Sequence, residues 1–469
     1  MIQRPSPPYS LLKENKQLLV LALPLILNYF VEGCPNFINN AMIAHLGETE
    51  LAAGAIINTA FTGALVFLYG ILAAASTLIS HHAGANEKKE IGNVIKDACY
   101  LGLICSVLLF LLLFYIGAIL KWSGQSEALI LLAQQYSHGL MFAVIPDFAT
   151  MILWQFFIGL GRTTVTLISS LLYVPISIFA NYVLMFGHFG FPKWGLFGIG
   201  LGTALGYTFL LLGMLAYLLF DPRYRAYFAN IQWLSLGSWK INATKTAKTS
   251  SHLPALLKVG LPLGIIWGID TTFLMFAAFF AGKFSTTLLA AQQVGVQAIT
   301  LTFMLLSGLA QAISIRMGYT WGAKSYHLGK AIYLSGLSLS FIVTLCISTL
   351  FWFKPLWLIG VDFDVHAPQN KQLVLLASHF LYVFGAYQLL NSLRYALFAA
   401  LRGMKDTYFP AICSFLCFYL IGIGGGYPLL FHWHGTMFDF WYLVIIALSL
   451  MVLALYWRLS SKLKEFTAL

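Results

Sequence analysis

The segment LPLGIIWGID, residues 261–270, decides the fold, because the chain contains a second version of it. LPLILNYFVE, residues 23–32, aligns with it without a gap, so that Pro24 matches Pro262 and Glu32 matches Asp270 (262 − 24 = 270 − 32 = 238). The same offset of 238 places Leu51-Ala52-Ala53 on Leu289-Ala290-Ala291, and several glycine and serine positions follow it too. The chain therefore contains an internal duplication, with one acidic residue in an apolar segment of each half.

The composition is that of a polytopic membrane protein. The chain is 59% hydrophobic and only 9% charged, whereas soluble domains carry roughly 25% charged residues. At ~1.5 Å rise per residue, its apolar runs of about 20 residues or more each cross a ~30 Å hydrocarbon core as a helix, and they are too long and too uniformly apolar for barrel strands. We predict an all-α membrane protein with twelve transmembrane helices near residues 17–45, 51–80, 93–119, 128–159, 163–187, 196–220, 253–282, 287–318, 327–353, 370–401, 406–432 and 437–459.

The distribution of Lys and Arg predicts the orientation in the membrane. Most basic residues lie in the loops on one side, which the positive-inside rule makes cytoplasmic. With an even number of spans, both termini are then cytoplasmic, and we expect the protein in the cell inner (plasma) membrane. The net charge of +11 is explained by this topology, so we expect the lipid bilayer and no nucleic acid as a partner, and a monomer.

The duplication predicts two homologous lobes. Residues 226–252 are polar and basic and form a candidate cytoplasmic linker between an N-lobe, residues 1–225, and a C-lobe, residues 253–469. An offset of 241 continues the repeat from Ser137-His138 to Ser378-His379. Six spans in each lobe predict a pseudo-two-fold axis along the membrane normal and a cleft where the lobes face each other.

Acidic residues inside the predicted spans are the first candidates for an ion-coupling site. Glu32 and Asp270 are costly in the hydrocarbon if ionised and unpaired, so each needs a proton, a cation or a basic partner. Asn36 and Asn39 share the helical face of Glu32 and are candidate substrate ligands, although amides in membranes also form hydrogen-bonding stripes between helices. Asp147, in the fourth span after a proline, is a further acid at depth with a candidate substrate role.

Aromatic residues precede both acids by three positions. Tyr29 lies before Glu32 and Trp267 before Asp270, so ring and carboxyl group share a helical face. Such a face can hold a lipophilic organic cation, or it can be ordinary packing.

The second half carries more polar residues in its spans. Gln293 and Gln297 lie on one helical stripe with Thr300, which predicts either oxygen ligands for an ion and the lining of an aqueous cleft, or a helix-packing seam. Arg394 follows Asn391 by one turn, and Asp270 is its candidate partner, with snorkelling to the cytoplasmic interface as the alternative.

No P-loop, dinucleotide motif, nucleophile elbow or HExxH is present, so we expect no enzyme, no cofactor and an ion gradient as the driving force.

Several short segments together resemble one transporter family. They are Ala44-His45-Leu46-Gly47, Leu261-Pro262-Leu263-Gly264, Ala291-Gln292-Gln293, Ile315-Arg316-Met317-Gly318-Tyr319, Tyr387-Gln388-Leu389 and Leu401-Arg402-Gly403-Met404-Lys405-Asp406-Thr407, with Asn181-Tyr182 in span five. This set resembles the multidrug and toxic compound extrusion (MATE) family over nearly the whole chain, most closely its bacterial NorM-type branch.

The resemblance implies a two-lobed exporter that expels lipophilic organic cations in exchange for H⁺ or Na⁺. Asp270 stands at the family's acid position in span seven. Two positions depart from the pattern, because Asn39 and Asn391 stand where the family usually has Asp. Neither amide carries a proton, so a proton role in the first half would pass to Glu32.

We therefore predict a secondary active multidrug antiporter that works by alternating access, with small-molecule organic cations as substrates. The alternative is a flippase or exporter of a lipid-linked or other amphipathic metabolite on a related two-lobed fold. A cleft rich in Arg and Lys would favour that alternative, whereas the deep charged residues here are mainly acidic.

Overall fold

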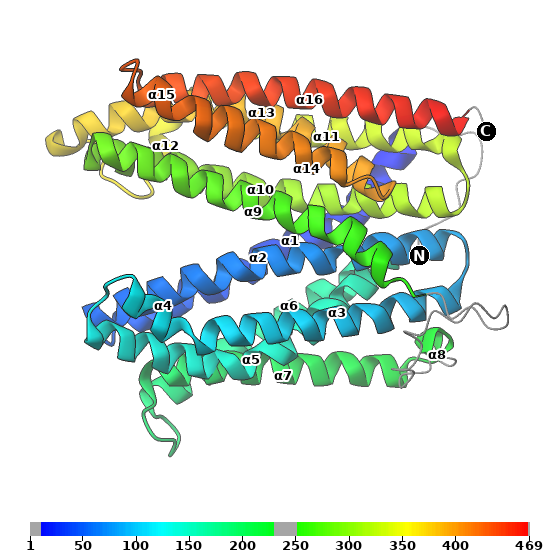
Figure 1. The fold of residues 1–469 in the computed structure, drawn as a ribbon, viewed down its shortest axis with the longest axis horizontal. Coiled ribbons are helices and arrows are strands. Elements are labelled where there is room, and N and C mark those ends of the chain that lie inside the picture. The colour runs from blue at the N-terminus through cyan, green and yellow to red at the C-terminus, as the bar shows by residue number, and fades with distance from the viewer. Residues whose placement is uncertain (1–10, 229–250, 468–469) are drawn as a thin grey trace. The chain divides into compact units, whose positions relative to one another are not determined.

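The computed structural model describes residues 11–228 and 251–467, and this part of the chain contains helices and no strand (Figure 1). The helices are α1 (Leu11–Ala44), α2 (Glu48–Gly84), α3 (Lys88–Phe114), α4 (Ile116–Trp122), α5 (Glu127–Gly159), α6 (Thr163–Phe186), α7 (Gly195–Phe220), α8 (Pro222–Phe228), α9 (Leu253–Phe284), α10 (Thr286–Gly322), η1 (Tyr326–Leu328), α11 (Gly329–Phe353), α12 (Pro355–Ile359), η2 (Pro368–Asn370), α13 (Lys371–Gly403), α14 (Tyr408–Ser414), η3 (Phe415–Gly425), α15 (Gly426–Phe431) and α16 (Met437–Thr467).

Twelve helical segments of the described residues are long and apolar enough to cross a membrane, as the sequence predicts. They correspond one to one to the predicted spans, and the eleventh, Tyr408–Phe431, is built from α14, η3 and α15. The protein is therefore a multi-pass membrane protein.

Local sequence signals explain where some of these helices begin and end. Ser285 caps α10, since its hydroxyl oxygen accepts a hydrogen bond from the amide of Leu288 at 3.0 Å, and Ser126 caps α5 in the same way. Gly187 ends α6 with φ of 77°, a left-handed conformation that favours glycine.

The described chain divides into two compact units. One unit, called unit 1 below, consists of residues 30–228 and 251–264, and the other, unit 2, of residues 11–29 and 265–467. The unit boundaries thus lie inside α1 and α9, each of which begins in one unit and continues in the other. Most of the predicted linker, residues 226–252, lies outside the described residues.

A close helix contact in each unit follows the internal repeat. In unit 1, a Cβ atom on Gly70 of α2 would lie 2.5 Å from the Cα of Gly264, near the start of α9. In unit 2, a Cβ on Gly308 of α10 would lie 2.8 Å from the backbone nitrogen of Ile26 in α1. Gly70 and Gly308 are related by the offset of 238, and so are Ile26 and Gly264. The same glycine contact therefore occurs twice, each time with the first helix of the other repeat.

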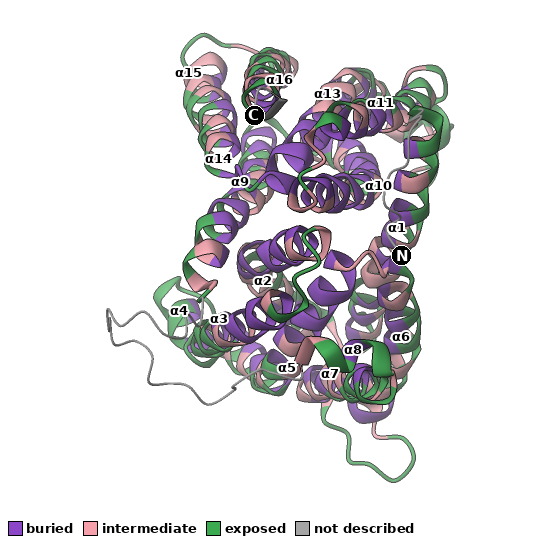
Figure 2. Ribbon diagram, turned by 90° about the vertical axis from the view of Figure 1, so that its right-hand side faces the viewer, coloured by how far each residue is buried: buried purple, intermediate pink, exposed green. Residues whose placement is uncertain are grey.

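The burial pattern fits helices that face lipid. In Figure 2 the exposed residues lie on the outer faces of helices such as α3, and many of them are large and apolar. On α3 they include Leu103, Val107 and Phe110. Apolar side chains on the outside are stable only against hydrocarbon, which supports the assignment of these helices as membrane spans.

Substitution of the repeated glycine tests the close contact. We expect Gly70→Val to lower the free energy of unfolding by about 1–3 kcal/mol, because the new side chain overlaps the backbone of α9, and Gly308→Val to do the same in unit 2. Gly63→Val is the matched control, since a Cβ there meets nothing within 4 Å. Thermal unfolding of the detergent-purified protein measures the effect, and equal melting temperatures for Gly70→Val and Gly63→Val would contradict it.

Candidate functional site

Asp270 of α9 and Arg394 of α13 form an ion pair inside unit 2. The guanidinium donates from Nη1 to Oδ1 at 3.0 Å and from Nη2 to Oδ2 at 2.8 Å. The Arg394 side chain is 5% exposed and that of Asp270 is 18% exposed. Arg394 therefore pairs with Asp270, the partner predicted from the sequence. The alternative, in which the Arg394 side chain snorkels to the interface, is not what the structure has.

Neutral groups hold the guanidinium from its other side. Arg394 Nε donates to Asn391 Oδ1 at 3.0 Å, and Asn391 Nδ2 donates to Gln388 Oε1 at 3.4 Å. Gln388 Nε2 in turn donates to the backbone carbonyl of Ile299 at 3.1 Å. This chain of hydrogen bonds fixes Arg394 to α10 as well as to α9.

Two aromatic residues that the sequence did not single out complete this cluster. The Tyr395 hydroxyl donates to Asp270 Oδ2 at 3.0 Å. The Arg394 Cζ atom lies 4.6 Å from the Tyr395 ring centroid and 5.0 Å from that of Phe418, so the cation sits against two ring faces. Nothing in the sequence marks Tyr395 except its place beside Arg394, and Phe418 comes from a different helix.

The other candidates of the second half do not join the Asp270 cluster. Gln293, Gln297 and Thr300 lie on an exposed face of α10, and none of them forms a hydrogen bond with Asp270 or Asn391. Trp267, one turn before Asp270, is partly exposed, and so is Tyr29 in the α1 segment of unit 2.

In unit 1, two of the three asparagines of the predicted site contact each other. Asn181 Nδ2 donates to Asn39 Oδ1 at 2.8 Å, and both side chains are buried. Thr203 donates to Asn181 Oδ1 at 3.4 Å. On the same α1 face, Asn36 is exposed and Glu32 is half-buried. The Asn39 position therefore holds a neutral pair of amides that satisfy each other.

Asp147 lies deep in unit 1, on α5, and is 1% exposed. Its Oδ1 accepts a hydrogen bond from the hydroxyl of Tyr69 on α2. The Tyr69 ring also packs edge-on against Phe148, with centroids 5.8 Å apart. Tyr69 is a third residue that sequence reasoning missed, because it is one of many aromatic residues in an apolar span.

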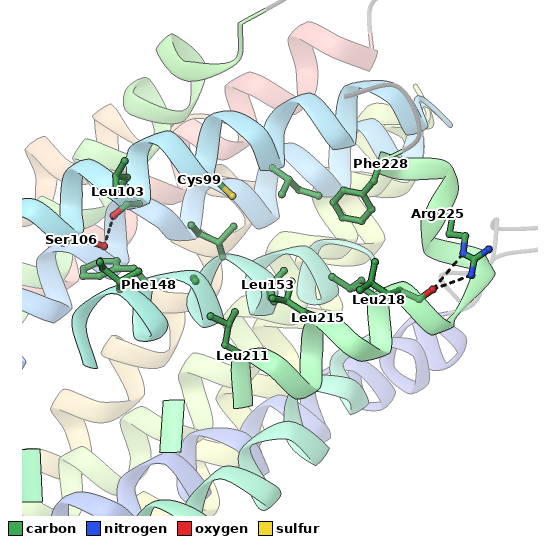
Figure 3. A pocket seen from close by; sticks show the side chains of 16 residues that line it. Cys99, Leu103, Ser106, Phe148, Leu153, Leu211, Leu215, Leu218, Arg225 and Phe228 are labelled. Atoms are coloured by element: carbon green, nitrogen blue, oxygen red, sulfur yellow. Dashed lines mark hydrogen bonds between the residues drawn. The ribbon is translucent and has the colours of Figure 1, made fainter. Parts of the chain in front are cut away.

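An apolar pocket of about 730 Å³ lies elsewhere in unit 1, between α3, α5, α7 and α8 (Figure 3). Leucine side chains from α7 and α3 line it, and Arg225 lies at one end, where it donates to the Leu219 carbonyl at 3.3 and 3.2 Å. None of the predicted site residues lines this pocket. Phe148, which packs against Tyr69, does line it, whereas Asp147 and Tyr69 do not.

Twelve apolar helical segments of the described residues, with an ion pair inside one of the units, define a polytopic membrane protein. Comparison of structures agrees with the fold. The chain resembles the outward-facing conformation of a multidrug resistance MATE family transporter of the MOP superfamily, with a TM-score of 0.82, 17% identity and coverage of 99% of both chains. It also resembles the eukaryotic MATE transporter AtDTX14, with a TM-score of 0.80, 17% identity and coverage of 97% and 98% of the two chains.

Comparison of sequences identifies the family. The MatE family profile matches residues 24–183 and 262–427, so the chain belongs to the MatE family. Among its relatives is a protein named "Probable multidrug resistance protein NorM" from Pseudomonas syringae pv. tomato, 27% identical over 94% of each chain. A protein of the same name from Bacillus anthracis is 28% identical over 96% of each chain. The resemblance predicted from short segments is thereby confirmed.

Removal of one charge from the Asp270–Arg394 pair should destabilise unit 2. We expect Asp270→Asn to cost up to about 3–5 kcal/mol, because it leaves a buried guanidinium without a counter-ion. The double variant Asp270→Asn/Arg394→Met removes both charges and should recover most of that loss. Thermal unfolding of the wild-type protein, Asp270→Asn, Arg394→Met and the double variant measures the coupling. Strictly additive effects of the two single variants would show that the pair contributes nothing.

Proposed function

We propose that this protein is a secondary active multidrug efflux antiporter that exports lipophilic organic cations in exchange for H⁺ or Na⁺. The observation that carries the proposal is the half-buried Asp270 carboxylate within a membrane span, whose charge is balanced by Arg394. Membership of the MatE family and the multidrug resistance names of its relatives support the export of drug-like molecules.

The mechanism rests on competition for one carboxylate. In the structure Asp270 is occupied by the guanidinium at 2.8–3.0 Å. A proton on Asp270 would remove its attraction for Arg394, and an organic cation would replace the guanidinium. Arg394, a proton and a substrate cation cannot occupy Asp270 at the same time. We propose that these partners bind Asp270 with different affinities in the inward-facing and outward-facing states. Alternating access requires such a difference in affinity.

The geometry around Asp270 supports H⁺ over Na⁺ as the coupling ion. Both carboxylate oxygens already accept from Arg394, and Oδ2 accepts from Tyr395 as well. A sodium ion would need several oxygen ligands in the space that the guanidinium fills, whereas a proton needs no such space. Gln293 and Gln297 would serve as ion ligands only after a rearrangement, since neither is bonded to Asp270 here.

Aromatic and polar groups near the acids supply candidate contacts for the substrate. Trp267 and Tyr29 are partly exposed, and we propose that their aromatic rings contact a lipophilic cation. The exposed Asn36 and Thr300 offer polar contacts, and we propose Asn39, Asn181, Asp147 and Arg394 as further residues that set the charge and shape of the transport path. A flippase for an anionic lipid is less well supported, because the deep base Arg394 is neutralised by Asp270.

We further propose that the protein works as a monomer in the plasma membrane, with both termini in the cytoplasm. The excess of Lys and Arg on one set of loops supports this orientation.

Transport by reconstituted vesicles tests the proposal. Vesicles that contain the wild-type protein should move ethidium, a lipophilic cation, when a pH gradient is imposed, and added sodium should not be required. Asp270→Asn should reduce this transport to the level of empty vesicles, because the amide cannot bind a proton. Glu127→Gln, which changes an exposed acid at the start of α5, is the control and should transport normally.

The amount of folded protein in each vesicle preparation is to be matched by size-exclusion chromatography before reconstitution. Gradient-driven transport that persists in well-folded Asp270→Asn would contradict a coupling role for this residue. Transport that requires sodium and ignores the pH gradient would replace H⁺ by Na⁺ as the coupling ion.

A further inference from the structure

A cluster of acids and tyrosines lies in unit 1, apart from the Asp270 cluster. Asp147 of α5 accepts from Tyr69 of α2, and both interact electrostatically with their neighbours Tyr173 of α6 and Tyr207 of α7. Glu32 of α1 interacts with Tyr69 and Tyr173. Tyr173 and Tyr207 stack with ring centroids 4.5 Å apart. Five helices of one unit thus bring ionisable groups together.

The two carboxyl oxygens of Asp147 have different surroundings. Oδ1 accepts the Tyr69 hydrogen bond, whereas Oδ2 is buried and has no hydrogen-bond partner in the structure. α3 also packs against α5 and brings Lys96 and Asp97 into unit 1, but neither forms a hydrogen bond or ion pair with Asp147. Among the described residues, no lysine, arginine or histidine contacts this carboxyl group.

The other buried acids of the protein are treated differently. In the described part of the chain, the buried Glu14 pairs with Arg316 at 2.7 Å and the buried Asp406 with Arg458 at 2.8 Å. Asp97 accepts from the backbone amide of His252, and the half-buried Asp270 pairs with Arg394. An ionised carboxylate at Asp147 would have one hydroxyl donor and no cation in a 1% exposed site within the membrane, at a cost of several kcal/mol. A proton on Oδ2 removes that charge without any change in packing.

We propose that Asp147 is a proton-binding site of unit 1, with Tyr69 as a positioning residue. The proton comes from water, binds Oδ2 and returns to water on release, while Oδ1 keeps its hydrogen bond from Tyr69. Phe148 holds the Tyr69 ring in place through the edge-on contact. The pair would give unit 1 the protonatable group that the neutral Asn39–Asn181 pair cannot provide. A role of Asp147 in transport rests on the proposed antiport. Proton binding at Asp147 does not depend on that proposal.

Infrared difference spectroscopy of the purified protein tests this site without any transport. Protonated carboxylic acids give a C=O stretching band at a higher frequency than the bands of carboxylates and amides. We expect wild-type protein to show such a band at neutral pH and Asp147→Asn to lose that component. Tyr69→Phe keeps the aromatic ring but removes the donor, so the band should remain and shift to higher frequency.

Asp270→Asn is the matched control, because Asp270 is ionised in its pair with Arg394 and should contribute nothing to this band. A band that survives unchanged in Asp147→Asn overturns the proposal, and so does a band that disappears in Asp270→Asn instead.

Thermal unfolding gives a second, independent reading. Asn at position 147 resembles the neutral protonated acid, so Asp147→Asn should leave the melting temperature unchanged or raise it. A marked fall would show that the native group is a stabilised carboxylate, against the proposal. Failure of the wild-type protein to transport under a pH gradient, with the infrared result intact, would instead count against the antiport alone.

Discussion

The close contact of a helix backbone with a glycine, repeated in both units, is the constraint on which the rest of the structure depends. Gly70 admits the α9 backbone at Gly264 in unit 1, and Gly308 admits the α1 backbone at Ile26 in unit 2. Six residues after each contact point, about 9 Å along a helix, come Glu32 and Asp270. Each acid therefore lies just beyond the place where its helix passes from one unit to the other. A side chain at either glycine would displace the helix that positions the acid.

The same repeat gives the two units different solutions for buried charge. Unit 2 neutralises Asp270 with Arg394 and holds the guanidinium with Asn391 on its other side. Unit 1 has no such base at Asp147, so the proposed solution there is a bound proton. Removal of one charge from a buried ion pair leaves the other charge uncompensated, whereas a lone protonated acid has no partner charge. The two sites would therefore respond differently when a cation enters.

The sequence predicts those features that depend on composition and on depth in the membrane. The twelve spans follow from apolar length, and the Asp270–Arg394 pair follows because a deep base needs an acid. Tyr69 and Tyr395 could not be predicted, because an apolar helix gives no periodic signal for which of its aromatic residues faces a carboxyl group. The division of α1 and α9 between units depends on tertiary contacts of glycines, and composition alone does not reveal it.

In the proposed mechanism, Asn391 would hold the Arg394 guanidinium when another cation binds Asp270. If a substrate cation takes Asp270, Arg394 loses its counter-ion while still inside the membrane, and an uncompensated guanidinium there is costly. Asn391 and the chain through Gln388 to the Ile299 carbonyl offer the guanidinium neutral acceptors that remain after Asp270 is taken. An aspartate at position 391 would instead be a second anion beside Arg394 and would compete with Asp270 for the guanidinium. In the proposed mechanism, a neutral amide at this position would therefore leave Asp270 as the carboxylate that is exchanged among guanidinium, proton and substrate.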